Sequence, residues 1–170
     1  NKIETNTINF TPIVPAQPDT LKALSRVTIT GQVEDLSGTF LPNFNGIIYP
    51  TIYDKKNLIT CLGNDASSLP AASFYVQKNV LYKGKASVVN GIFTFSFIVP
   101  KDIAYQYGKG RISYYAHNGL EDASGFNEDI LIGGSDSTAP TDLVGPDTKL
   151  FLNDETFVSG GITNENQEIY

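Results

Sequence analysis

The chain has 170 residues, a net charge of −6 and a pI near 4.6, and its lysines and arginines form no cluster. A nucleic-acid-binding protein needs clustered cations to neutralise phosphates, so no nucleic-acid partner is expected. No run approaches the roughly 18 apolar residues of a membrane-spanning helix, so no membrane span is expected in this sequence.

The composition suits one domain of roughly 100–150 residues with flanking segments. Hydrophobic residues make up 41% of the chain, which is enough for one core, and a single Cys excludes an internal disulfide. Because the sequence does not begin with Met, we expect it to be part of a longer or processed protein.

Proline and glycine divide the chain into four parts. Residues 1–20 contain three prolines and little periodicity, which predicts an extended arm or linker. Residues 21–134 carry the periodic pattern of a folded domain. Residues 135–148 are rich in Gly, Ser, Thr, Pro and Asp and predict a second linker. Residues 149–170 resume a strand pattern and are expected to begin a following β module.

The strongest local pattern is a predicted β-hairpin. Asn90-Gly91 tolerates the positive φ angles of a type I′ turn, and Phe93, Phe95 and Phe97 then alternate with polar residues. Seven or eight short strands are expected in total, at residues 27–33, 47–53, 58–62, 74–77, 82–89, 92–99, 112–116 and 129–132.

Some connecting segments carry their own predictions. Pro50 favours a sheet edge or a bulge within the second strand. Residues 101–107 are expected to form one helical turn, and residues 121–128 a polar loop.

Short strands separated by turn signals, without helical periodicity, predict an all-β fold. We expect an immunoglobulin-like antiparallel β-sandwich, because such strands recur over about 110 residues. A closed barrel is the alternative, because the same alternation suits both architectures.

Several segments also resemble the non-catalytic region of the PorU-like type IX secretion sortases, a group of gingipain-type cysteine peptidases of Bacteroidetes. The resemblance covers residues 19–166. The matching segments are FNG (44–46), YPT (49–51), DKK (54–56), QKNVLYKGKAS (77–87), FIVPKDI (97–103), YGKG (107–110), ISYYA (112–116), DASGFN (122–127) and LFLNDE (150–155).

The resemblance implies a module downstream of a peptidase domain. The parent protein would cleave the sorting signal from exported cargo and attach that cargo to anionic lipopolysaccharide at the extracellular face of the outer membrane. The implied partners are the upstream peptidase domain of the same parent chain and other secretion-system proteins. No cofactor is expected.

The family's peptidase dyad is a His followed later by a Cys, whereas Cys61 precedes His117 here. Neither catalytic position is therefore carried over, and no catalytic residue is predicted. A nucleophile–base pair of Cys61 and His117 is the alternative. We expect Cys61 to be a small apolar filler in a buried strand and His117 to be a surface residue beside a turn.

Acidic and amide oxygens gather between residues 121 and 129, and hard oxygens are the ligands that calcium requires. The calcium candidates are Asp122, Asn127, Glu128 and Asp129, with Glu121 nearby. Their spacing is not that of an EF-hand. We expect these residues to form a solvated loop, so no metal site is predicted.

Tyrosines near the end of the domain offer a possible sugar-binding surface. Tyr114 and Tyr115 face opposite sides of a strand, so one of them is expected in the core. Tyr105 and Tyr107 precede that strand, where they would stack on sugar rings or pin the turn by hydrogen bonds to the backbone.

Lys78, Lys83 and Lys85 form a small basic group, in which Lys83 and Lys85 share one face of a strand. They would meet an acidic partner or phosphates, or protect an exposed sheet edge from pairing, which is the commoner role. Lys83, Lys85, Tyr105 and Tyr107 are therefore the predicted interaction surface.

The favoured function is a structural or docking module of a secreted PorU-like sortase. A cell-surface carbohydrate-binding or adhesion module is the alternative. A fragment that keeps hydrolase activity is a third hypothesis, which the missing dyad disfavours.

Overall fold

A computed structural model describes residues 1–14, 18–64 and 71–139. Residues 1–139 form one compact unit. The all-β prediction is confirmed, because the described residues contain strands and turns but no helix. The expected following module at 149–170, and most of the linker at 135–148, lie outside the described residues.

In the part of the chain that the structure describes, we found no helix long and apolar enough to cross a membrane.

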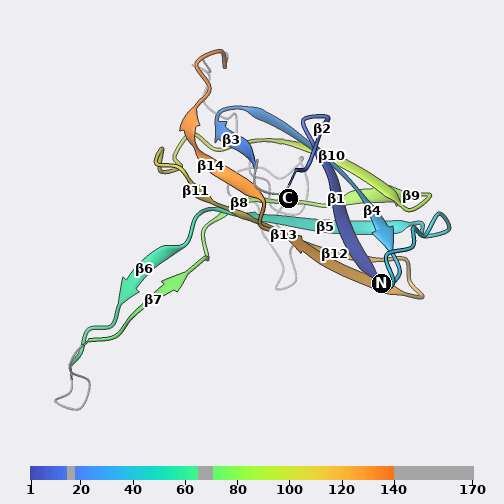
Figure 1. Cartoon of the computed structure of the whole chain (residues 1–170), viewed down its shortest axis with the longest axis horizontal. Coiled ribbons are helices and arrows are strands. Elements are labelled where there is room, and N and C mark those ends of the chain that lie inside the picture. Colours follow the sequence, from blue (N-terminus) through green and yellow to red (C-terminus); the bar gives the residue numbers. More distant parts are fainter. Residues whose placement is uncertain (15–17, 65–70, 140–170) are drawn as a thin grey trace, which may run out of the picture. The chain divides into compact units, whose positions relative to one another are not determined.

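The described strands pair into one large sheet, a three-stranded sheet and a two-stranded ribbon (Figure 1). Their bounds are β1 (Lys2–Ile8), β2 (Thr11–Pro12), β3 (Asp19–Ala23), β4 (Arg26–Glu34), β5 (Gly46–Tyr53), β6 (Asn57–Thr60), β7 (Ser73–Val76), β8 (Val80–Lys83), β9 (Ala86–Val89), β10 (Ile92–Ile98), β11 (Gly108–Lys109), β12 (Arg111–His117), β13 (Asp122–Asn127) and β14 (Ile130–Ser135).

The large sheet closes into a seven-stranded barrel in the order β12-β13-β1-β4-β10-β9-β5. Closure occurs at β5, which pairs with β9 and β8 along one edge and with β12 along the other. The predicted immunoglobulin-like sandwich is therefore not found, since its two sheets would each keep free edges. The closed barrel, the alternative from the sequence, describes the fold.

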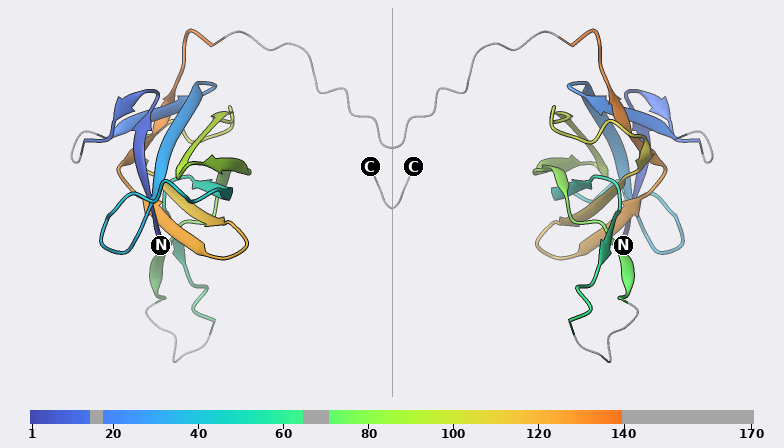
Figure 2. Two further views of the ribbon diagram at one scale, coloured as in Figure 1. Left: turned by 90° about the vertical axis from the view of Figure 1, so that its right-hand side faces the viewer. Right: turned by 90° about the vertical axis from the view of Figure 1, so that its left-hand side faces the viewer.

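Alternation places one set of side chains inside this wall. On β10 the buried residues are Phe93, Phe95 and Phe97, whereas Thr94 and Ser96 between them and Ile92 and Ile98 at the two ends face outward. Gly31 on the neighbouring β4 leaves room for the Phe93 ring, because a Cβ there would collide with it. The rings of β10 pack against Tyr82 of β8 and Tyr114 of β12. Figure 2 shows β4 and β10 lying side by side in the wall of the barrel.

The predicted hairpin is confirmed. Asn90 and Gly91 have φ angles of 51° and 76°, and Ile92 pairs with Val89 across the turn. The first hairpin strand is interrupted, however, because β9 and β8 are separate strands on either side of Gly84 and Lys85.

Pro50 lies inside the sheet and not at an edge. Its carbonyl oxygen accepts a hydrogen bond from the Gly84 amide (3.1 Å), so its missing N–H faces the break between β9 and β8. The predicted edge is wrong, but an irregularity does lie opposite this proline.

The first residues differ from the predicted arm. β1 is antiparallel to β4 over most of its length, and both Ile3 and Ile8 are buried in the core. Its alternating burial is masked in the sequence by polar residues, including Thr5, whose hydroxyl bonds Tyr114 inside the barrel. Residues 2–8 therefore belong to the domain.

Two connecting segments also differ from expectation. Residues 101–107 contain a turn and no helix, and residues 122–127, predicted as a loop, form β13. Ala123 is the inward residue of β13, and β12 pairs along its whole length. The sequence did not predict this strand because its residues are mostly small or polar and show no apolar alternation. Backbone pairing with β12 stabilises it instead.

The three-stranded sheet β11-β14-β3 shares the barrel's core. Leu21 and Ala23 from β3 are fully buried, as are Ile130 and Ile132 from β14. The predicted strand at 129–132 is confirmed as part of β14, and β3 extends the domain two residues before the expected boundary at 21.

An ion pair joins the start of β1 to the end of β4. Lys2 Nζ lies 3.0 Å from Glu34 Oε2, and Gln32 donates to Glu34 Oε1 at 2.8 Å. Glu34 is buried, and the hydrogen bonds from Gln32 and Lys2 hold its pKa below the ordinary 4.5. The carboxylate is thus favoured in the folded state.

Glu34→Gln should make folding less sensitive to acid. A lowered folded-state pKa contributes stability that is present above about pH 5 and is lost as the pH falls through that pKa. Urea unfolding between neutral pH and about pH 2 should therefore show a smaller loss of unfolding free energy in the variant. Lys2→Met should act in the same direction. If acid lowered the unfolding free energy of the variant as much as that of the unmodified protein, the role of the ion pair would be contradicted. The acid sensitivity that remains in the variant is assigned to Asp35 and Asp136, whose pKa values are also lowered by hydrogen bonds.

Candidate binding face

The structure does not bring Cys61 and His117 together. Cys61 follows β6, beyond the end of β5, whereas His117 pairs with Ile47 near the start of β5. At about 3.3 Å per residue, that strand alone separates them by roughly 20 Å. Cys61 is also exposed, so the predicted burial of this residue is wrong.

The four calcium candidates do not converge. Asp122 and Asn127 lie at opposite ends of β13, and the Asn127 side chain accepts a hydrogen bond from the Asp129 amide (2.8 Å). In the described ranges no three His, Cys, Asp or Glu side chains are close enough to hold a metal ion.

Tyr114 and Tyr115 face opposite sides of β12, as predicted. Tyr114 is buried, its hydroxyl lies 2.8 Å from Thr5 Oγ1, and burial raises the pKa of its phenol. Tyr115 points outward and is 46% exposed.

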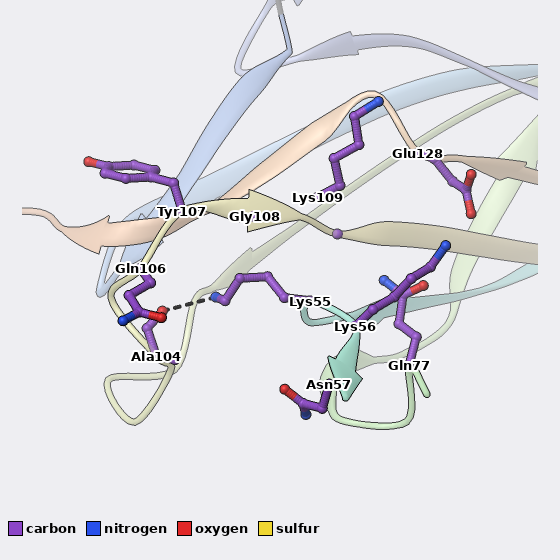
Figure 3. Close-up of a pocket in the computed structure, with 11 residues that line it drawn as sticks. Lys55, Lys56, Asn57, Gln77, Ala104, Gln106, Tyr107, Gly108, Lys109 and Glu128 are labelled. Atoms are coloured by element: carbon purple, nitrogen blue, oxygen red, sulfur yellow. Dashed lines mark hydrogen bonds between the residues drawn. The ribbon is translucent and has the colours of Figure 1, made fainter. Parts of the chain in front are cut away.

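Tyr105 and Tyr107, predicted at an interaction surface, are both exposed. The Tyr105 hydroxyl donates to the Lys101 carbonyl oxygen across a long 3.4 Å, a weak form of the predicted turn pinning. The Tyr107 ring is directed away from Lys55 and Lys56 (Figure 3). Neither tyrosine is paired with another ring in the described residues.

A cavity of about 460 Å³ lies beside Tyr107, and its other lining residues include Lys55, Lys56, Asn57, Gln77, Gln106 and Gly108–Gly110 (Figure 3). Its most buried cation is already satisfied. Lys55 Nζ donates to Asp54 Oδ1 (2.8 Å) and to the carbonyl oxygens of Ala104 (2.9 Å) and Ile132 (3.3 Å). Lys55 therefore fastens the end of β5 to β14 and to the segment before β11.

The strongest candidate for binding lies on the outside of the barrel. Tyr115 stands directly opposite Tyr49 of β5, and the next outward residue of β12 is His117. The ring centroids are 6.3 Å apart for Tyr49–Tyr115, 5.8 Å for Tyr49–His117 and 6.0 Å for Tyr115–His117. We call Tyr49, Tyr115, His117 and Asp122 the aromatic face.

Asp122 adds a carboxylate to this face, because it pairs with His117 across β12 and β13. Desolvation, together with the nearby Asp122 carboxylate, raises the pKa of the Tyr115 phenol. At neutral pH the tyrosine is a neutral hydroxyl, like any phenol, and can both donate and accept hydrogen bonds.

Lys83 and Lys85, the predicted basic pair, lie along the neighbouring part of the wall. Lys83 stands opposite Thr51 of β5, on the edge strand β8, and both lysines are exposed. Their place agrees with protection of an edge, and it also puts cations beside the aromatic face.

Sequence reasoning found Tyr115, His117, Asp122 and both lysines but did not group them, and it missed Tyr49. Outward alternation of Ile47, Tyr49 and Thr51 was a usable signal. The register that places Tyr49 against Tyr115 was not, because β5 and β12 are separated by nearly sixty residues in the sequence.

Comparison with known proteins gives one informative match. The chain is similar to PorU from Porphyromonas gingivalis, in a crystal structure of its dimeric latent form, with 35% identity and a TM-score of 0.69. The match covers 94% of this chain and 15% of that one, so the chain spans a small part of PorU.

A second match is the sporulation control protein Spo0M from Bacillus subtilis, with 15% identity, a TM-score of 0.45, and coverage of 78% of this chain and 49% of that one. No protein-family model and no curated protein matches the chain.

Lys55→Met should destabilise the domain by about 3 kcal/mol, because it leaves the Asp54 carboxylate buried without its cation. Lys56→Met is the matched control, since Lys56 is exposed, and it should change the unfolding free energy by about 0.5 kcal/mol or less. Urea unfolding followed by circular dichroism measures both. Equal effects of the two substitutions would show that Lys55 has no special role.

Proposed function

Because this chain is a PorU-like region, similar over nearly its whole length to one part of PorU, we propose that it is a non-catalytic docking module of a PorU-like sortase. The parent would process type IX secretion cargo, and the module would lie at the extracellular face of the outer membrane. The single observation that carries the proposal is the 35% identity over 94% of the chain.

The placement of reactive groups supports a non-catalytic role. The single His of the chain pairs with the start of β5, whereas the single Cys follows β6, beyond the other end of β5. A thiolate nucleophile needs an imidazole within hydrogen-bond reach. The chemistry of the parent is therefore assigned to residues outside this chain.

The ribbon of β6 and β7 is the docking surface we propose. Among the strands of the described residues, these two pair only with each other, as Figure 1 shows. Leu58 stands opposite Tyr75 on one side, with exposed fractions of 58% and 70%, and Ile59 stands opposite Phe74 on the other. A two-stranded ribbon is marginally stable alone, and apolar pairs on both sides favour a covering partner.

We assign the partner as the peptidase domain of the same parent chain. This chain matches only 15% of PorU, so most of a PorU-like parent lies outside it and is available to cover the ribbon. The two central pairs of the ribbon, Leu58–Tyr75 and Ile59–Phe74, carry no charge and are mainly apolar, which is typical of the buried centre of an interface between protein domains.

Cys61→Ala in the full-length parent should leave cleavage of a sorting-signal peptide within about twofold of the unmodified protein. The thiol is exposed and remote from the imidazole, so its removal changes no reacting group. Peptide-cleavage assays with the purified parent measure the effect. A folded but inactive variant would overturn the non-catalytic assignment.

A photo-crosslinking residue at position 75 of the full-length parent should join the ribbon to the peptidase domain, and peptide mapping by mass spectrometry locates the joined residues. The same residue at position 126 is the matched control, because Phe126 is similarly exposed but lies on the barrel wall. Crosslinks from position 75 to no part of the peptidase domain would refute the docking assignment.

A further inference from the structure

Three rings stand together on the outside of the barrel without a structural need to be aromatic. Tyr49, Tyr115 and His117 lie within 6.3 Å of one another, and both tyrosines are exposed, at 37% and 46%. Cross-strand aromatic pairs stabilise a sheet by roughly 0.2–1 kcal/mol. A single cross-strand pair would supply this stabilisation, so it does not explain why two phenols and an imidazole lie together on one exposed surface.

Polar groups surround these rings in register. Tyr115 lies between Tyr49 and Ser124, and His117 lies between Ile47 and Asp122. Ser87 stands on the far side of Ile47, and Lys83 pairs with the next outward residue of β5, Thr51. Hydroxyl, carboxylate and ammonium groups on β5, β8, β9 and β13 thus border the ring surface.

The combination of aromatic rings with bordering polar groups favours a saccharide over a protein as the partner of this face. The centre of a protein interface is depleted of Lys, Asp and Ser, because their desolvation must be compensated. A saccharide has C–H bonds on the flat side of its ring and hydroxyls around the edge. Its C–H groups meet the negative face of an aromatic ring, and its hydroxyls reach the bordering polar groups.

We propose that the aromatic face binds a saccharide through one pyranose ring. The sugar ring packs on Tyr115 and Tyr49, and His117 closes one side. The Asp122 carboxylate accepts hydrogen bonds from the sugar hydroxyls, and the Tyr115 phenol, which stays neutral, can donate or accept another. Lys83 and Lys85 lie where an acidic substituent on a neighbouring sugar would extend.

The face contains a built-in reporter, because His117 is the only histidine in the chain. We would titrate the full 170-residue chain with the methyl pyranosides of glucose, galactose, mannose and glucuronate and follow the imidazole proton signals by NMR. A saturable shift with at least one glycoside is expected. No saturable shift with any of the four, nor with the oligosaccharides of a glycan array, would overturn the proposal.

Substitutions with matched controls separate this face from the rest of the surface. Tyr115→Thr and Tyr49→Thr should each weaken binding of the best glycoside about tenfold, because each removes one stacked ring while keeping a strand-forming residue. Tyr105→Thr and Tyr107→Thr remove rings elsewhere that are even more exposed, at 53% and 64%, and should leave affinity unchanged. Equal losses in all four variants would overturn the assignment.

Asp122→Asn keeps the proposal testable if a tyrosine variant does not fold. It should weaken binding about tenfold, whereas Asp102→Asn, in the turn after β10, should not. The double substitution Lys83→Ala and Lys85→Ala should weaken glucuronate binding more than glucose binding, because the two lysines are proposed to meet an acidic substituent of the saccharide. Unchanged affinity in Asp122→Asn would remove the carboxylate from the site and overturn the arrangement.

A protein partner on this face is an outcome that the same set of variants detects. Photo-crosslinking from position 115 to the peptidase domain, without a glycoside response at His117, would overturn the saccharide assignment. The docking proposal depends on the ribbon and on position 75, so either proposal can fail while the other stands.

Discussion

The double pairing of β5 is the constraint on which the rest of the structure depends. Residues 47–53 pair with β12 along one edge, and the two ends of β5 pair with β9 and β8 along the other. This double pairing turns an open run of strands into a closed wall. Closure gives every strand an inside and an outside. The inside holds the Phe93, Phe95 and Phe97 rings, and the outside carries Tyr49 and Tyr115. Core and candidate site are thus two sides of the same alternation.

Local signals predicted local structure well. The Asn90-Gly91 turn and the alternation of β10 follow from residues within ten positions of one another, so the sequence alone sufficed. The closure did not follow, because a barrel and a sandwich share the same alternation and differ only in which distant strands pair. β13 was missed because its inward residues Ala123 and Gly125 are small. β1 was missed because polar residues, among them the inward Thr5, interrupt the apolar alternation that Ile3 and Ile8 would otherwise show.

The same limit applies to the candidate site. Lys83, Tyr115, His117 and Asp122 were each noticed in the sequence for a separate reason, but their common place depends on the register between β5, β12 and β13. Cys61 shows the opposite error. Its apolar neighbours suggest a buried strand. It follows β6, however, whose ribbon pairs with no other described strand, and Cys61 is exposed.

The joint between β1 and β13 is the thinnest in the wall, with Lys2 and Ser124 as its one registered pair. Gly125 permits this approach, because a side chain there would strike the Ile3 carbonyl oxygen. An expression fragment that started at residue 21, where the periodic pattern begins, would lack β1, the strand that joins β13 to β4 and completes the barrel. It would leave β4 with a bare edge open to pairing with other molecules, so recombinant work on this domain must retain its first eight residues.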